Sequence, residues 1–247
     1  MLVLTAWLPG GLLIRLLSWV NLLLTISVCI PYTRVCFPND AKLILLLRRK
    51  DADGKRIAAI LNLLFLDAQG KLPREWPAAL VAELDVTAND KSRLPVAIGL
   101  LLSDAAEKKD SERAAELLER ALAICDQMLP DARRDFLIAA SCYHGFHRRD
   151  ASRSEEWLKR ARSVKSGASQ KDWDSRALAG VSYAKGDYTQ SAEFLASYVA
   201  LLDRQPMSGM VVAERERMIA LRNTLTAHAY AQACEGELTL LTIPGAT

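Results

Sequence analysis

Two histidines have the spacing that metal chemistry requires. His144 and His147 are three residues apart, with Cys142 and Asp150 close by in the sequence. Residues three apart share one face of an α-helix, and imidazole, thiolate and carboxylate are all zinc ligands. No second pair of such ligands accompanies them. The pattern therefore favours a polar helix end before Arg148, where histidine complements the negative end of the helix dipole.

The other reactive side chains form no recognisable catalytic motif. The sequence contains neither a Gly-x-Ser-x-Gly nucleophile turn nor a phosphate-binding Gly-x-x-x-x-Gly-Lys. His228 lies in an apolar helical stretch and is interpreted as a packing or interfacial residue. Asp40, taken by itself, is an ordinary residue at a helix N-terminus. Five widely spaced cysteines without a CxxC pair indicate buried thiols in a reduced environment rather than a disulfide framework: Cys29, Cys36, Cys125, Cys142 and Cys234.

The charge composition differs between the N-terminal and C-terminal parts of the chain. The chain has 247 residues, of which 51% are hydrophobic and 25% charged, and its formal net charge is +3. These values exclude wholesale disorder and give no support for nucleic-acid binding. Residues 1–80 carry ten basic and five acidic side chains, which leaves 22 basic and 24 acidic side chains for residues 81–247 out of totals of 32 and 29. The first part is therefore basic and the second slightly acidic.

The N-terminal part predicts a membrane segment. Residues 1–33 contain one charged side chain, Arg15, and residues 10–30 are long enough to span a bilayer. A secretory signal peptide fits less well, because a basic start and a cleavage site are missing. Basic residues follow the segment and none precedes it, so we expect an integral membrane protein whose C-terminal body faces the cytoplasm.

Shorter apolar runs follow, at residues 41–47 and 57–66, and each is too short to span a membrane. The basic residues around them are either solvated helix ends or contacts with anionic lipid headgroups: Arg48, Arg49, Lys50, Lys55 and Arg56.

Residues 91–235 have the period of paired helices. Turn aspartates Asp110, Asp150 and Asp187 separate helical segments and lie 40 and 37 residues apart. This pattern resembles degenerate tetratricopeptide repeats, with an irregular helical bundle as the alternative. The positions that correspond to the small and large packing residues of the repeat are Ala114, Leu118, Ala121, Ser154, Leu158, Ala161, Ala192 and Leu195. A long helix over 210–234 would cap the last repeat, and residues 236–247 would form a loose tail.

The segment between the predicted membrane span and the repeats carries several short motifs. They are Asn21-Leu22-Leu23-Leu24, Ile30-Pro31-Tyr32, Phe37-Pro38-Asn39-Asp40-Ala41 before an apolar helix, and Pro73-Arg74-Glu75-Trp76. Together they resemble the C-terminal part of the site-2-protease-like intramembrane zinc metallopeptidases. The resemblance covers about a third of the chain, and it implies that residues 34–90 correspond to the end of the protease core.

The resemblance also implies a role for Asp40, as the third zinc ligand of the family. The family's His-Glu-x-x-His motif does not occur in this chain, and Ala41 replaces the glycine that follows the aspartate. We therefore expect no zinc binding and no peptide hydrolysis by this chain alone, because catalytic zinc needs three protein ligands.

The sequence thus predicts an all-α protein with a transmembrane segment (1–33), a membrane-proximal region (34–90), helical repeats (91–235) and a tail. Two functions stay open. One is the C-terminal portion of a zinc metallopeptidase with a protein-binding repeat domain. The other is a membrane-tethered, non-enzymatic adaptor. Both imply contact with membrane lipid and with a protein partner.

Overall fold

The structure, a computed structural model, describes residues 51–84, 94–165 and 170–241, and five short stretches before them (17–20, 33–34, 37–38, 44–45 and 47–48). The chain divides into two compact units, residues 1–58 and 59–247. Apart from one two-residue strand pair, the regular elements of the described residues are helical, which confirms the all-α prediction. The unit boundary at 58/59 differs from the predicted boundaries at 33/34 and 90/91.

The first unit contains a short antiparallel pair that the sequence did not predict. Strand β1 (Thr33–Arg34) pairs with β2 (Phe37–Pro38), with Thr33 opposite Pro38. Within the described part of the chain, no helix has the length and apolar character needed to cross a bilayer. Of the predicted transmembrane segment (1–33), residues 17–20 are described as helical and Thr33 belongs to β1, while the rest lies outside the described residues, as does Asp40. The membrane prediction therefore stays a prediction.

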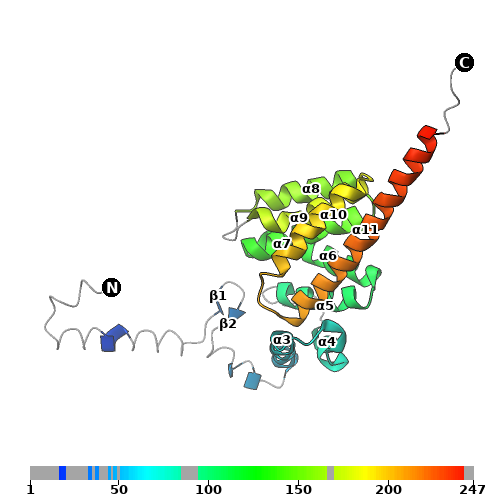
Figure 1. The fold of residues 1–247 in the computed structure, drawn as a ribbon. Helices are drawn as coiled ribbons and strands as arrows, with labels where there is room; N and C mark the ends of the chain where they lie inside the picture. Colours follow the sequence, from blue (N-terminus) through cyan, green and yellow to red (C-terminus); the bar gives the residue numbers. More distant parts are fainter. Residues whose placement is uncertain are drawn as a thin grey trace, which may run out of the picture. The chain divides into compact units, whose positions relative to one another are not determined.

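Figure 1 shows the helices, coloured along the sequence from blue at the N-terminus to red at the C-terminus. Helix α3 (Ala52–Ala68) runs across the unit boundary. The remaining helical elements are η1 (Pro73–Glu75), α4 (Ala78–Leu84), α5 (Leu94–Glu107), α6 (Ser111–Ile124), η2 (Cys125–Gln127), α7 (Pro130–Cys142), η3 (Tyr143–His147), α8 (Ala151–Ser163), α9 (Gln170–Ala184), α10 (Tyr188–Leu202) and α11 (Gly209–Leu241).

Consecutive helices form packed pairs. Helix α5 packs on α6, α7 on α8 and α9 on α10, while α7 also packs on α9 and α11 on α10. Three adjoining clusters of buried apolar side chains fill the space between them. Helix α11 continues to Leu241, whereas the sequence predicted a loose tail from residue 236.

The three turns within these pairs share one construction. Asp110, Asp150 and Asp187 each cap the second helix, because the carboxylate accepts the N–H of the residue three positions later at 3.0, 3.0 and 2.9 Å. The residue before each aspartate is in the left-handed region, with φ of 56° at Lys109, 52° at Arg149 and 82° at Gly186. The predicted turns at these aspartates are confirmed.

The middle turn contains one additional residue. The N–H groups of Asp110 and Asp187 donate to carbonyls five positions back, whereas that of Asp150 donates to His144, six positions back. The extra residue is accommodated in η3, which is a π-helix. This insertion accounts for part of the longer spacing between the first two turn aspartates.

Small side chains let the two helices of a pair approach each other. The Ser154 hydroxyl donates to the carbonyl of Ser141 at 2.8 Å, and the Ser191 hydroxyl donates to that of Ala179 at 2.8 Å. Both serines are fully buried, so these bonds also satisfy polar groups that water cannot reach. Of the predicted packing residues, Ala114 and Ala192 are half-buried and the others are buried, namely Leu118, Ala121, Ser154, Leu158, Ala161 and Leu195.

Helices α7 and α9 meet most closely at two glycines. A Cβ atom added to Gly145 of η3 would lie 2.5 Å from the backbone of Gly180 in α9. A Cβ atom added to Gly180 would instead have its nearest neighbours at 3.5 Å, an ordinary contact distance. The two backbones therefore touch through the Gly145 side, and no side chain fits there.

We predict that Gly145→Ala destabilises the protein by about 3 kcal/mol, since the new methyl group overlaps backbone that cannot rotate away. Gly180→Ala is the matched control on the opposite side of the same contact. It should be neutral, or stabilising by about 0.5 kcal/mol from the better helix propensity of alanine. Urea unfolding of both variants measures the difference, and equal stabilities would contradict the close approach.

Candidate functional site

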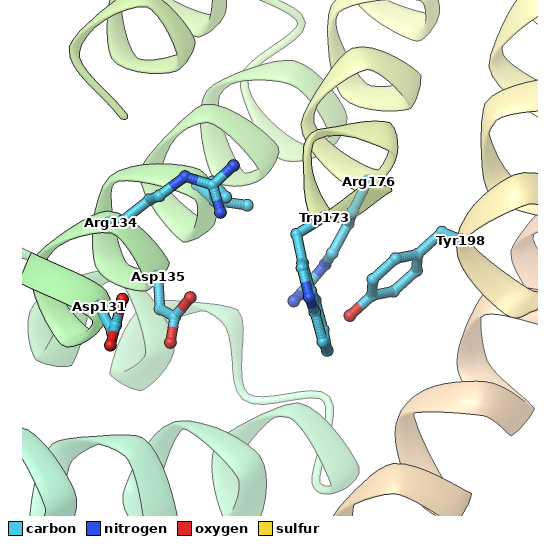
Figure 2. A pocket seen from close by; sticks show the side chains of 7 residues that line it. Asp131, Arg134, Asp135, Trp173, Arg176 and Tyr198 are labelled. Carbon is cyan, nitrogen blue, oxygen red and sulfur yellow. The ribbon is translucent and has the colours of Figure 1, made fainter. Parts of the chain in front are cut away.

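A cavity of about 390 Å³ lies between α7, α9 and α10. Its lining is mixed, with four charged side chains, two aromatic rings and one aliphatic side chain. Figure 2 shows the charged and aromatic groups from three helices converging on one space. The lining residues are Asp131, Arg134, Asp135, Ile138, Trp173, Arg176 and Tyr198.

The helical period explains why these side chains meet. On α7 the four lining residues occupy positions i, i+3, i+4 and i+7 from Asp131, which is one face of a helix. Trp173 and Arg176 are likewise three apart on α9. The charged lining residues of α7 and both lining residues of α9 lie in the N-terminal halves of their helices, whereas the glycine contact between α7–η3 and α9 lies toward the C-terminal ends. The two helices are therefore in backbone contact at one end and leave room for the cavity at the other.

Asp174 joins three helices behind the cavity. Its carboxylate accepts hydrogen bonds from Arg134 of α7 at 2.6 Å and from Arg162 of α8 at 2.8 Å. The Asp174 and Arg134 side chains are 7% and 4% exposed. Losing one partner would leave an unpaired charge in a low-dielectric interior, so the pairing holds α7, α8 and α9 in one arrangement.

Arg176 is held in a second ionic group. Its guanidinium lies 3.1 Å from the Glu214 carboxylate of α11, and Glu214 accepts a hydrogen bond from Arg217 at 2.6 Å. Arg217 donates in turn to Glu107 of α5 at 3.1 Å. Burial alone would lower the pKa of Arg176, but Glu214 outweighs it and raises that pKa, so Arg176 is always charged. For Glu214, burial would raise the pKa, but Arg176 and Arg217 bring it below its ordinary value of 4.5.

Two aromatic rings form one wall. The Trp173 and Tyr198 rings meet edge to face with centroids 6.0 Å apart, and the Arg176 guanidinium lies 6.0 Å from the Tyr198 ring centroid. Burial raises the pKa of the Tyr198 phenol, and Arg176 only partly opposes this shift. The phenol is therefore neutral at physiological pH and can donate a hydrogen bond.

Among the charged lining residues, Asp131 and Asp135 form no ion pair within the described part of the chain. Both are exposed, and both line the cavity. Desolvation by the surrounding protein raises the pKa of Asp135, Asp131 adds to this shift, and Arg134 and Arg176 oppose it without reversing it. A raised carboxyl pKa means that the ionised group is less stable here than in water.

The predicted histidine pair does not lie in this cavity. His144 and His147 belong to the π-helix η3, and the Tyr143 ring contacts both, with centroids 5.7 and 5.5 Å away. Burial lowers the pKa of both imidazoles below 6.5, with help from Arg153 at His144 and Arg148 at His147. Both imidazoles lie in the last turn before Arg148, at the polar helix end that the sequence predicted, and a pKa below 6.5 favours their neutral form at pH 7.

The other candidate residues are also placed by the structure. His228 is exposed, and the centroid of its ring lies 5.8 Å from that of the Tyr188 ring. Cys125 and Cys142 are buried free thiols, and burial raises the pKa of both, to about 11 for Cys142, which disfavours the reactive thiolate form. Cys29 and Cys36 lie outside the described residues, as does the side chain of Cys234. Within the described ranges, no three histidine, cysteine, aspartate or glutamate side chains are grouped to hold a metal ion.

The basic residues for which the sequence predicted solvent or lipid contact differ in their exposure. Arg48 and Lys55 are exposed, whereas the Arg56 side chain is 10% exposed and pairs with Asp53 at 3.4 Å. Lipid contact by these basic residues therefore stays a prediction, and Arg56 is the least exposed of the three that the structure describes. Arg49 and Lys50 lie outside the described residues.

Sequence reasoning missed the cavity. The available signal was the set of Asp131, Arg134 and Asp135 on one face of a helix, together with Trp173 at the start of another. A polar helix face of this kind is normally exposed to solvent. It lines a cavity here because α9 and α10 supply the opposite walls.

Comparisons of the chain with models of protein families, with curated proteins and with solved structures find no match.

We predict that Glu214→Gln lowers the free energy of unfolding at pH 7 by about 3 kcal/mol, because Arg176 then loses its buried counter-charge. The loss should shrink as the pH falls. Since the folded pKa of Glu214 lies below 4.5, its stabilising effect is complete above 4.5 and disappears as the pH drops through the folded pKa.

Glu216→Gln is the matched control for this prediction. Glu216 is 52% exposed and lies 3.5 Å from Arg74, so its loss should cost under about 1 kcal/mol. Chemical denaturation at pH 7 and at pH 4 measures both variants. A pH-independent difference between Glu214→Gln and the unmodified protein would contradict the ionic role of Glu214.

Proposed function

We propose that residues 91–235 form a tetratricopeptide-like protein-binding domain, and that the cavity between α7, α9 and α10 receives a segment of the partner. The repeated turn at Asp110, Asp150 and Asp187 supports the repeat assignment, since the same cap and the same left-handed residue occur in each pair. Stacked helix pairs present extended surfaces to which partners bind.

The cavity carries this proposal. Its volume of about 390 Å³ is within the range of sites that hold one side chain or a small group. Aromatic rings give large contact area at low entropic cost, and charged groups at the rim give specificity. The surrounding ion pairs fix the walls before a partner arrives, which reduces the cost of binding.

The test is a selection of peptides from a random display library on the full chain in detergent micelles. We expect the selected sequences to converge and to bind Trp173→Ala at least tenfold more weakly, because that variant removes one of the two rings of the aromatic wall. Fluorescence anisotropy of the selected peptides measures the affinities.

Tyr230→Ala is the control for this selection, because Tyr230 is 75% exposed on α11 and does not line the cavity. It should bind the selected peptides as the unmodified chain does. A selection that yields no converging sequence would contradict the protein-binding proposal. Peptides that bind Trp173→Ala unchanged would contradict the assignment of the cavity.

We further propose, on the motifs around Asp40 and Trp76, that the chain corresponds to the C-terminal portion of a site-2-protease-like protein anchored in the membrane. The alternative is the tethered adaptor with the same repeat domain. The expected result is an apolar reading frame upstream of Met1 that contains His-Glu-x-x-His. Several hundred bases without one would favour the adaptor, and recovery of the chain in the carbonate-soluble fraction would contradict the anchor.

A further inference from the structure

We infer that the cavity between α7, α9 and α10 binds the cationic side chain of a lysine or arginine in the partner segment. This inference rests on the proposed function and specifies the chemistry of the bound group. It is carried by the distribution of charge among the lining residues, by the aromatic wall and by the size of the space.

The two arginines of the cavity already have counter-charges. Arg134 donates to Asp174 at 2.6 Å, and Arg176 lies 3.1 Å from Glu214. Each arginine is therefore paired with a carboxylate that does not itself line the cavity. Asp131 and Asp135 are the charged lining residues that form no ion pair within the described part of the chain, so their carboxylates remain available to an entering cation.

The carboxylate of Asp135 lacks a matching cation. Asp131 is its neighbour on α7, and Arg134 and Arg176 face it from α7 and α9, yet their effect does not offset the desolvation of the carboxylate. A cation beside Asp135 would supply the missing counter-charge in a partly enclosed space, where a charge-assisted hydrogen bond is stronger than in water.

The aromatic wall suits the same ligand. Trp173 and Tyr198 meet edge to face, and Arg176 already lies over the Tyr198 ring. Ammonium and guanidinium groups are attracted to the faces of such rings, with tryptophan the strongest. The aliphatic stem of lysine or arginine would pack on Ile138 and the rings, while its charged end would reach the carboxylates.

An anionic ligand fits these observations less well. A carboxylate or phosphate in the cavity would compete with Asp174 and Glu214 for arginines that are already paired, and it would face Asp131 and Asp135 as well. Like charges in a partly enclosed space repel each other strongly.

The experiment uses the Trp173-dependent peptides from the selection described above. The expected result is a lysine or arginine at one fixed position. Replacing that residue with acetyl-lysine or citrulline, which keep the length and remove the charge, should weaken binding at least tenfold. Asp135→Asn should weaken the original peptide by a similar factor and leave the citrulline peptide unaffected. Glu193→Gln, at an exposed site on α10, is the matched control and should change neither affinity.

The melting temperature of Asp135→Asn and the pH dependence of peptide affinity provide two further tests. Asp135→Asn should melt at about the same temperature as the unmodified chain, because Asp135 is exposed and forms no ion pair within the described residues. Affinity for the cationic peptide should rise with pH through the range in which Asp135 ionises, with Asp131, Arg134 and Arg176 as the groups that face it.

Selected peptides that need Trp173 but carry an acidic or uncharged residue at the fixed position would overturn this inference and leave the protein-binding function intact. Equal affinity of the citrulline and arginine peptides would also overturn it. A selection without converging peptides would instead count against the proposed function itself.

Discussion

The arrangement of the repeat helices depends on two carboxylates at helix contacts, Asp174, which is buried, and Glu214, whose side chain is 12% exposed. Asp174 binds arginines from α7 and α8 while it sits on α9, and Glu214 of α11 binds Arg176 of α9. A buried carboxylate without its partner costs several kcal/mol, so only a packing that brings each arginine to its carboxylate is stable. Apolar contacts tolerate small shifts of one helix on another, whereas these ionic contacts do not. Together they hold α7, α8, α9 and α11 in one relative position.

The cavity is a consequence of the same contacts. The arginines that line it are directed toward Asp174 and Glu214, while Asp131 and Asp135 keep their negative charge toward the open space. The glycine contact between η3 and α9 acts at the other end of the same two helices, where it brings the backbones together. One end is therefore tightly closed and the other has room for a ligand. A site that is fixed in this way needs little rearrangement on binding, which favours affinity and specificity.

The helices themselves could be predicted well from the sequence. The helical period over residues 91–235 and the turn aspartates correctly predicted helix pairs that meet at Asp110, Asp150 and Asp187, because helix caps and amphipathic stripes are local signals. The π-helix η3 was not foreseen. Its cause is an additional residue accommodated before the turn at Asp150, and the sequence around His144 reads as ordinary helix. The stacking of His144 on Trp157 of α8 was not predicted either, because it depends on how α8 packs beside η3.

By itself, the sequence determined the helical class, the three turns and the separation of a basic, apolar start from a slightly acidic helical body, because these properties depend on neighbours within a few positions along the chain. The tertiary structure alone decided which charges are paired. Asp135 and Asp174 are both aspartates on helical segments, and nothing local distinguishes them. Asp174 is buried between two arginines, whereas Asp135 lines a cavity, since the neighbours of each come from other helices. Electrostatic role is a property of the packed arrangement, and so is the site that this arrangement forms.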